Sequence, residues 1–243
     1  MKRTLALLLS ALLLLPGCGS AREEAAPVSD EVQETAAETE NDAEGSVEEA
    51  SDAEVSGADT AAQAPAADGD SNVLVIYFSR PGEQYTVGVI EEGNTAIVAG
   101  MVAEETGADV FEVLPADDHY PTTYEALTEV AMQEQTDGAR PAFAGELPDL
   151  SGYDTIFIGS PVWWGDWPMI MYTLFESTDF SGKTLIPFST HEGSGLSGFD
   201  RKLGEKAEGA VIGKGLAVRG NDAQNKRDEV RETVREWLAE LGF

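Results

Sequence analysis

The sequence is poor in cysteine, histidine and basic residues. Its 243 residues include one cysteine, two histidines and 15 lysines and arginines, against 45 aspartates and glutamates. A single cysteine excludes an intrachain disulfide framework and a metal site built from several thiolates. The two histidines, His119 and His191, leave little for a histidine-rich metal centre. The net charge of −30 argues against binding to nucleic acid, because contacts to phosphates need clustered lysine and arginine.

The sequence also lacks a hydrophobic run long enough to span a bilayer. The longest apolar stretch, Leu5–Leu15, has about half of the ~20 residues that a membrane-spanning helix needs. It follows Lys2 and Arg3, and a short cationic stretch before a short apolar one is typical of an export signal. No arginine pair precedes it, which favours export of an unfolded chain.

The apolar stretch ends in Leu15-Pro16-Gly17-Cys18. This ending resembles the bacterial lipobox, in which the cysteine becomes the lipidated first residue after cleavage. We therefore expect residues 1–18 to be a lipoprotein signal peptide and Cys18 to anchor the protein outside the cytoplasm. The alternative is an ordinary signal peptide with a chance cysteine.

Residues 19–71 form a strongly acidic segment. They hold 16 aspartates and glutamates and one base, Arg22, and they contain no aromatic residue. Such a composition cannot bury enough apolar surface to offset the entropy lost on ordering. We expect a disordered acidic linker, extended by repulsion between its charges, ahead of a domain at 72–243.

Residues 72–243 alternate between short apolar runs and amphipathic segments, which predicts one α/β domain with a parallel sheet covered on both faces. The expected strands are 73–78, 109–113, 155–159, 184–188 and 216–218. The expected helices are 94–107, 122–134, 168–176 and a last helix that ends near Leu241 and is capped by Asn221 or Asp222. Asn94 is the expected N-cap of the first helix, and Pro187 conflicts with a regular central strand.

Three loops follow strands at the carboxyl edge of this sheet, which is the usual ligand site of such folds. The first carries Ser79 and leads to Asn94 and Thr95, whose hydroxyl and backbone N–H groups at a helix start favour an anion. The second, 159–168, places three tryptophans within five residues as a flat aromatic wall. The third, 189–195, is rich in glycine and exposes backbone N–H and C=O groups.

Together, the three loops resemble the flavodoxin superfamily, in a branch with the motifs Tyr-Phe-Ser-Arg, Pro-x-Trp-Trp-Gly and Thr-His-Glu-Gly-Ser-Gly. The resemblance covers essentially all of 72–243. It implies a flavodoxin-like three-layer sandwich, a five-stranded parallel sheet of order 2-1-3-4-5 and bound FMN. An insertion between Gly82 and Gly93 departs from the compact phosphate loop of flavodoxins, and it leaves the roles of Glu83, Tyr85 and Thr86 open.

The resemblance also assigns residues to parts of FMN. The phosphate would be held by Ser79, Asn94 and Thr95, with Arg80 nearby. The isoalloxazine would be bordered by Pro161, Val162, Trp163, Trp164 and Gly165. Its polar edge would meet the backbone of Thr190, His191, Glu192, Gly193, Ser194 and Gly195.

Several of these residues have alternative roles. Trp167 is expected in the core, and either Trp163 or Trp164 would be the stacking partner. His191 would tune or protonate the flavin, or would only be hydrogen-bonded within its loop, and His119 is expected to be structural. Ser194 lies in Gly-Ser-Gly and not in the nucleophile elbow Gly-x-Ser-x-Gly, which argues against a hydrolase.

Three function classes follow, and none requires a catalytic side chain. The first is an FMN-dependent electron carrier whose acidic surface steers basic redox partner proteins. The second is an FMN-dependent oxidoreductase that reduces a quinone or another small acceptor. The third is a binding module that uses the fold without a cofactor.

Overall fold

The computed structural model describes residues 72–243. The expected signal peptide, Cys18 and the acidic linker lie outside the described residues. The central sheet is formed by six parallel strands, β1 (Val73–Tyr77), β4 (Asp109–Glu112), β5 (Thr155–Pro161), β6 (Thr184–His191), β7 (Val211–Ile212) and β8 (Leu216–Arg219). A separate antiparallel hairpin pairs β2 (Gly82–Gln84) with β3 (Gly88–Ile90).

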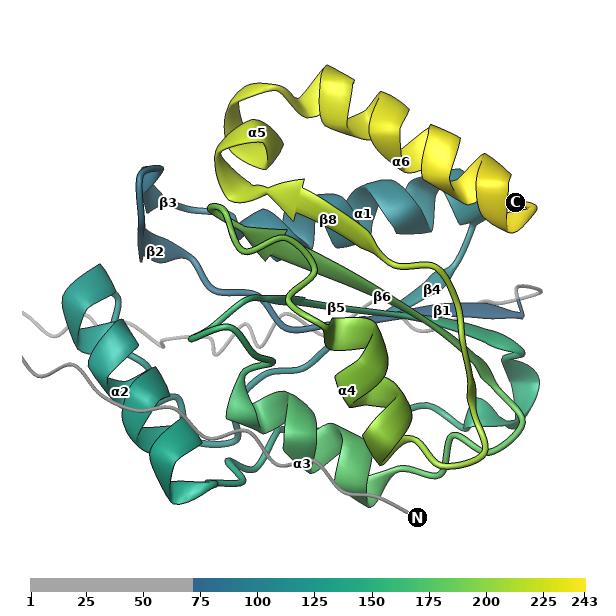
Figure 1. Ribbon diagram of the computed structural model, residues 1–243, viewed down its shortest axis with the longest axis horizontal. Helices are drawn as coiled ribbons and strands as arrows, with labels where there is room; N and C mark the ends of the chain where they lie inside the picture. The colour runs from purple at the N-terminus through teal and green to yellow at the C-terminus, as the bar shows by residue number, and fades with distance from the viewer. Residues whose placement is uncertain (1–71) are drawn as a thin grey trace, which may run out of the picture. The chain divides into compact units, whose positions relative to one another are not determined.

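Helices cover both faces of this sheet (Figure 1). They are α1 (Asn94–Thr106), α2 (Tyr124–Asp137), α3 (Met169–Ser177), α4 (Phe199–Lys206), α5 (Gly220–Asn225) and α6 (Arg227–Leu241), with a short 3-10 turn at Leu150–Gly152. The sheet order is β4-β1-β5-β6, with β7 and β8 both outside β6. Numbered along the chain as the expected strands, this is the order 2-1-3-4-5.

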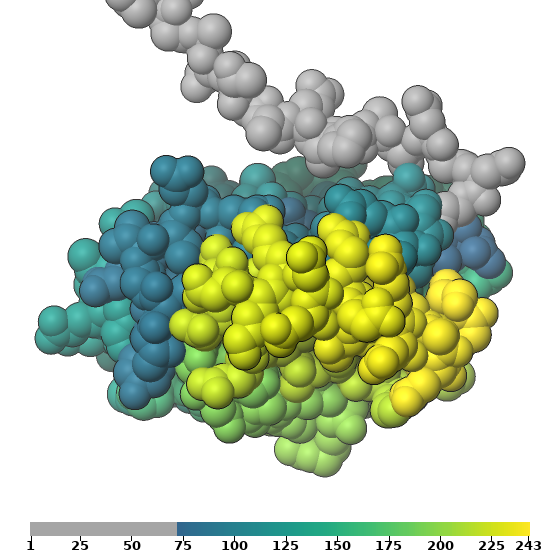
Figure 2. Space-filling model, turned by 90° about the horizontal axis from the view of Figure 1, so that it is seen from above, coloured from purple at the N-terminus to yellow at the C-terminus, as the bar shows by residue number. Residues whose placement is uncertain are grey.

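The central strands β1, β5 and β6 are buried on both faces, as expected for the middle of a sheet covered by helices. Along β1, Leu74 and Ile76 point into one core and Val73 and Val75 into the other. The first core is closed by α2, α3 and α4, and the second by α1, α5 and α6. Figure 2 shows α5 and α6, in yellow, over the second face. The result is a three-layer sandwich.

The sheet has six strands and not the expected five, because its last strand is split opposite Pro187. The Leu185 carbonyl accepts a hydrogen bond from Gly213 N–H at 2.8 Å, at the end of β7. Backbone groups of successive residues in a strand point to opposite neighbouring strands, so those of Pro187 point to the same side as those of Leu185. Proline has no N–H to donate there. The ladder stops there and resumes at Phe188, which pairs with Leu216 of β8. Pro187 therefore lies within β6, which runs three residues beyond the expected end at Phe188.

Two predicted helix caps differ from the structure. The N-cap of α1 is Gly93, so Asn94 is the first helical residue and not the cap. The expected last helix is two helices, α5 and α6, and Asn221 and Asp222 lie inside α5. The end of α1 at Gly107, in the left-handed region with φ 68°, is as predicted.

Among the helices of residues 72–243, none is both long and apolar enough to cross a membrane.

Two glycines with different surroundings test the packing of the sheet. A Cβ added to Gly159 in β5 would lie 2.0 Å from the fully buried ring of Phe188, whereas one added to Gly100 in α1 would meet nothing within 4 Å. We expect Gly159→Ala to lower the free energy of unfolding by about 1–3 kcal/mol through overpacking. Gly100→Ala should raise it by about 0.5–1 kcal/mol, because alanine loses less entropy in a helix. Urea unfolding measures both, and a shift of the same sign in the two variants would contradict this packing.

Candidate functional site

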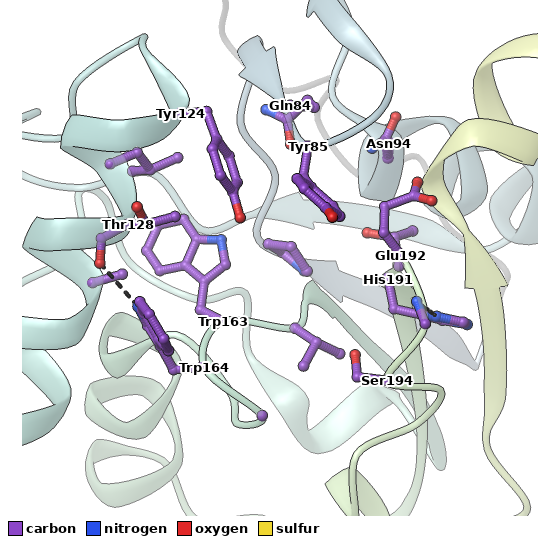
Figure 3. A pocket seen from close by; sticks show the side chains of 17 residues that line it. Gln84, Tyr85, Asn94, Tyr124, Thr128, Trp163, Trp164, His191, Glu192 and Ser194 are labelled. Atoms are coloured by element: carbon purple, nitrogen blue, oxygen red, sulfur yellow. Dashed lines mark hydrogen bonds between the residues drawn. The ribbon is translucent and has the colours of Figure 1, made fainter. Parts of the chain in front are cut away.

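A cleft of about 360 Å³ opens at the carboxyl ends of β5 and β6, next to the start of α1 (Figure 3). Parallel strands end at the same edge of a sheet, so their following loops meet there. The cleft is lined by 11 of the 15 residues expected at the cofactor: Asn94, Pro161, Val162, Trp163, Trp164, Gly165, Thr190, His191, Glu192, Gly193 and Ser194. The other four, Ser79, Arg80, Thr95 and Gly195, do not line it.

The tryptophan loop is a tight turn between Trp163 and Asp166. Their backbones exchange two hydrogen bonds of 2.9 Å, and the residues between them both have positive φ, 50° at Trp164 and 73° at Gly165. This is the conformation of a two-residue hairpin turn, which glycine adopts readily and tryptophan rarely does. Trp164 is held in it by a 2.9 Å hydrogen bond from its Nε1 to the Thr128 carbonyl.

The three neighbouring tryptophans have different environments. Trp163 is partly buried and packs edge-on against Phe78 and Tyr120, with ring centroids 5.4 and 5.3 Å away. Trp164 is 52% exposed. Trp167 is buried and stacks on Phe199, which confirms its expected place in the core. Trp163 is therefore the fixed wall of the cleft and Trp164 its outer rim.

The glycine-rich loop after β6 is closed by its own hydrogen bonds. The Ser189 hydroxyl donates to the Gly195 carbonyl at 3.1 Å, and Gly193 N–H donates to Nδ1 of His191 at 2.9 Å. The Glu192 carboxylate accepts a 2.6 Å hydrogen bond from Asn221 N–H, which ties the loop to α5. A loop held in this way presents a fixed set of backbone groups to the cleft.

The start of α1 is held close to the first loop. Ser79 Oγ accepts a 3.1 Å hydrogen bond from Ala96 N–H, and a Cβ on Gly93 would lie 2.1 Å from that oxygen. The buried Thr95 hydroxyl is 2.7 Å from the Thr190 hydroxyl at the end of β6. The side chains of Ser79 and Thr95 thus fix the backbone, and within the expected phosphate set only Asn94 reaches the cleft.

Arg80 points to a different loop. Its guanidinium donates to Asp118 at 2.8 Å and to the Tyr120 carbonyl at 2.9 Å, and it lies over the Tyr120 ring. Its buried Nε has no partner within residues 72–243. Arg80 supports Tyr120, which in turn supports Trp163.

Six cleft residues were not anticipated. Two come from the inserted hairpin and four from α2: Gln84, Tyr85, Tyr124, Leu127, Thr128 and Ala131. The spacing of Tyr124, Leu127 and Ala131 marks one face of a helix, but it does not show that this face borders a cleft. The hairpin is absent from the flavodoxin pattern, so its residues had no expected position.

The hairpin is fastened to the first turn of α2. Glu83 N–H donates to the Thr122 carbonyl at 2.7 Å, and the Glu83 carboxylate accepts from Tyr124 N–H at 2.9 Å. Glu83 thereby caps α2, whose own N-cap Thr123 makes no side-chain cap. Tyr85 stacks on Tyr124, with centroids 5.5 Å apart and an interplanar angle of 29°. The insertion thus builds a wall of the cleft.

The two histidines have opposite protonation requirements. Each ring nitrogen of His119 faces an acceptor: Nε2 lies 2.7 Å from the Glu134 carboxylate, and Nδ1 lies 2.9 Å from the Asp117 carbonyl. Both nitrogens can donate only when the ring carries two protons and is a cation. The hydrogen bond to Glu134 is the main cause that raises the pKa of His119. His191 accepts at Nδ1, so its proton is on Nε2. Burial is the main cause that lowers the pKa of His191.

A titration followed by NMR should resolve these two histidines, the only two in the chain. We expect one to titrate above the unfolded value of about 6.5 and the other below it. The contribution of His119 to folding stability is complete at pH values below the unfolded pKa of about 6.5, and it is lost as pH rises through the raised pKa of the folded state. The contribution of His191 to folding stability is complete above about pH 6.5, and it is lost as pH falls through the lowered pKa of the folded state. His119→Gln should remove only the higher signal, and two signals that titrate together near 6.5 would contradict these environments.

Comparisons with known proteins agree with this architecture. A family model described as flavodoxin matches residues 72–239. A protein from Bacteroides uniformis, assigned as a flavoprotein, is 34% identical in sequence, with a TM-score of 0.55 over 69% of this chain and 97% of that chain. No functionally curated protein matches the sequence.

Two further solved structures are similar in fold. A protein from Bacteroides eggerthii, also assigned as a flavoprotein, is 25% identical, with a TM-score of 0.49 over 65% of this chain and 96% of that chain. A flavoprotein from Lactobacillus acidophilus, solved in complex with FMN, is 22% identical, with a TM-score of 0.47 over 64% and 96%. From the family model and the Bacteroides uniformis relative, the chain belongs to the flavodoxin family.

Proposed function

We propose that this protein binds FMN in the cleft and carries electrons between redox partners outside the cytoplasmic membrane, to which a lipidated Cys18 anchors it. The observation that carries the proposal is the meeting of three features in one cleft. These are the N-terminus of α1 at Asn94, the fixed indole of Trp163 and the closed loop 190–195. Membership of the flavodoxin family supports the choice of cofactor.

The residues present fit the three chemical parts of FMN. The first N–H groups of a helix have no partner within the helix, and Ala96 N–H is already taken by Ser79. The N–H group of Asn94, which lines the cleft, is left for a phosphate, together with the Asn94 side chain. Glycine at position 93 lets this backbone approach the first loop, where a Cβ would collide with Ser79. The flat ring would lie between Trp163 and loop 190–195.

Neutral groups would hold the cofactor. The cleft lining contains no lysine or arginine, and its one acidic residue, Glu192, is engaged by Asn221 and Arg219. A phosphate would therefore depend on backbone N–H groups, the α1 dipole and the Asn94 amide. Each of these is weaker than a lysine or arginine contact, and each is kept in place by the hydrogen bonds around it.

Bound FMN would supply the one- and two-electron chemistry, and the chain's residues bind it, orient it and limit water access. Trp163 cannot rotate freely, because Phe78 and Tyr120 meet it edge-on. His191 keeps a proton on Nε2 at the cleft and stays uncharged near neutral pH. Residues 72–243 carry a net charge of −17, which opposes the addition of electrons and favours basic partner proteins.

The alternative function is an FMN-dependent enzyme that reduces a quinone or another small acceptor. Such an enzyme needs room for the acceptor beside the cofactor, whereas a carrier needs only an accessible cofactor edge. The aromatic residues contributed by α2 and the inserted hairpin are the specific observation that favours this alternative.

Binding of FMN and of riboflavin by the full chain tests the cofactor assignment. We expect FMN to bind one to one with a structured visible spectrum, and Asn94→Ala to weaken FMN about tenfold while changing riboflavin less than threefold. The reason is that riboflavin lacks the phosphate, and a lost hydrogen bond to a charged group costs about 1.5–3 kcal/mol. Asn225→Ala, on an exposed amide of α5, is the matched control. Absence of FMN binding, or equal loss of both ligands, would contradict the proposal.

Membrane fractionation of cells that express the full chain tests the anchor. Cys18→Ser should move the protein from the membrane fraction to the soluble exported fraction, because several acyl chains hold a membrane stably and none would remain. Ser20→Ala, two residues away, is the control and should stay with the membrane. Unchanged membrane retention of the Cys18 variant would refute lipidation.

A further inference from the structure

The cleft has two chemically different halves. One half is polar and is formed by Asn94, Pro161 and the loop 190–194. The other, which we call the aromatic half, is formed by α2, the inserted hairpin and the tryptophan turn. Its residues are Tyr85, Tyr124, Leu127, Thr128, Ala131, Trp163 and Trp164. Apart from the two tryptophans, none of these belongs to the motifs that resemble flavodoxins.

The aromatic half offers hydrogen-bond donors and no charge. None of its seven residues is acidic or basic. The hydroxyls of Tyr85 and Tyr124 point into the cleft in Figure 3, and the Trp163 ring lies below them. Within residues 72–243, no hydrogen bond uses either hydroxyl or Nε1 of Trp163. Donors that have no partner in the described part of the chain suit a ligand that carries oxygen acceptors.

Its aromatic surfaces are held in place and partly open to solvent. Tyr85 is 56% exposed and Tyr124 is 38% exposed, although the two rings stack on each other. Glu83 fixes the hairpin to α2, and the Trp164 indole is tied to the Thr128 carbonyl. Because these side chains are already ordered, a flat ligand that covers them would gain apolar contact with little loss of side-chain entropy.

We propose that the aromatic half binds a neutral planar ring with carbonyl oxygens, of the quinone class, beside the cofactor. The rings of Tyr85 and Tyr124 would supply apolar contact, and their hydroxyls would donate to the carbonyl oxygens. This inference rests on the proposed function for the position of FMN, whose ring would lie between the polar half and Trp163. It assigns a function to the insertion between Gly82 and Gly93.

The same features disfavour charged ligands of similar shape. A nicotinamide dinucleotide carries phosphates, but the α1 N-terminus would already hold the FMN phosphate, and the cleft lining has no lysine or arginine to pair with others. An anionic ring would also approach a domain of net charge −17. A neutral quinone meets neither penalty, so a sulfonated analogue should bind more weakly than the parent ring.

The test measures equilibrium binding of oxidised 2-methyl-1,4-naphthoquinone and of 1,4-naphthoquinone-2-sulfonate, through quenching of tryptophan fluorescence. The full chain is used with Cys18→Ser, because quinones add to thiols, and it is measured with and without FMN. We expect the neutral quinone to bind at least tenfold more tightly than the sulfonate. Tyr124→Ala should weaken the neutral quinone about tenfold, from the loss of a ring contact of about 1.4 kcal/mol.

Matched variants separate the ring from its hydroxyl and the subsite from the cofactor. Tyr124→Phe should weaken the quinone only two- to fivefold, and Tyr85→Ala should fall between the two Tyr124 variants. Val89→Ala is the control, because Val89 is an exposed residue of the same hairpin and does not line the cleft. In all four variants the affinity for FMN should change less than twofold.

Three outcomes would overturn the inference. They are no binding of the neutral quinone, equal binding of the sulfonate, and a loss of FMN affinity in Tyr124→Ala as large as the loss of quinone affinity. The last result would mean that the aromatic half holds the cofactor itself. A chain that binds the quinone with these variant effects but does not bind FMN would refute the proposed function and leave the aromatic subsite supported.

Discussion

The burial of β1, β5 and β6 on both faces is the constraint on which the cleft depends. Buried strands must pair all their backbone groups within the sheet, and parallel pairing makes them end at one edge. Beyond that edge the backbone no longer pairs with neighbouring strands, and hydrogen bonds from side chains hold the loops in place instead. The Thr95–Thr190 contact and the Ser79–Ala96 hydrogen bond join the start of α1 to the ends of two strands. These contacts tie the start of α1, and with it the cleft, to the sheet.

The sequence was sufficient for the parts of the fold that depend on periodicity. All five expected strands and the three loops of the cleft exist, and strand order followed from the family resemblance. Side-chain roles were harder to predict, because Ser79, Thr95 and Arg80 have the right chemistry for an anion but are used by neighbouring backbone and by Asp118. A hydroxyl beside a helix start suits a cap and a ligand equally well, and only geometry separates them.

The inserted hairpin was beyond sequence-based prediction for a different reason. Its strands are three residues long, and its position depends on contacts to Thr122 and Tyr124, some forty residues away in sequence. Such a segment has no periodicity of its own, and the flavodoxin pattern has no counterpart for it. Its residues make the cleft asymmetric, with polar backbone on one side and aromatic rings on the other. If the proposals above hold, this asymmetry would separate the binding of a cofactor from the recognition of a second molecule.

The break in the outer strand opposite Pro187 also shortens the edge at which another copy of the chain could pair. An exposed, continuous strand would present a row of unpaired N–H and C=O groups to another chain. Here the outer edge consists of β7, with two residues, and β8, with four, separated by Gly213-Lys214-Gly215. Neither piece is long enough to template a ladder, and a lysine lies between them. A domain concentrated at a membrane surface by a shared anchor would meet its neighbours often, so an edge that resists strand-to-strand aggregation would keep each copy separate.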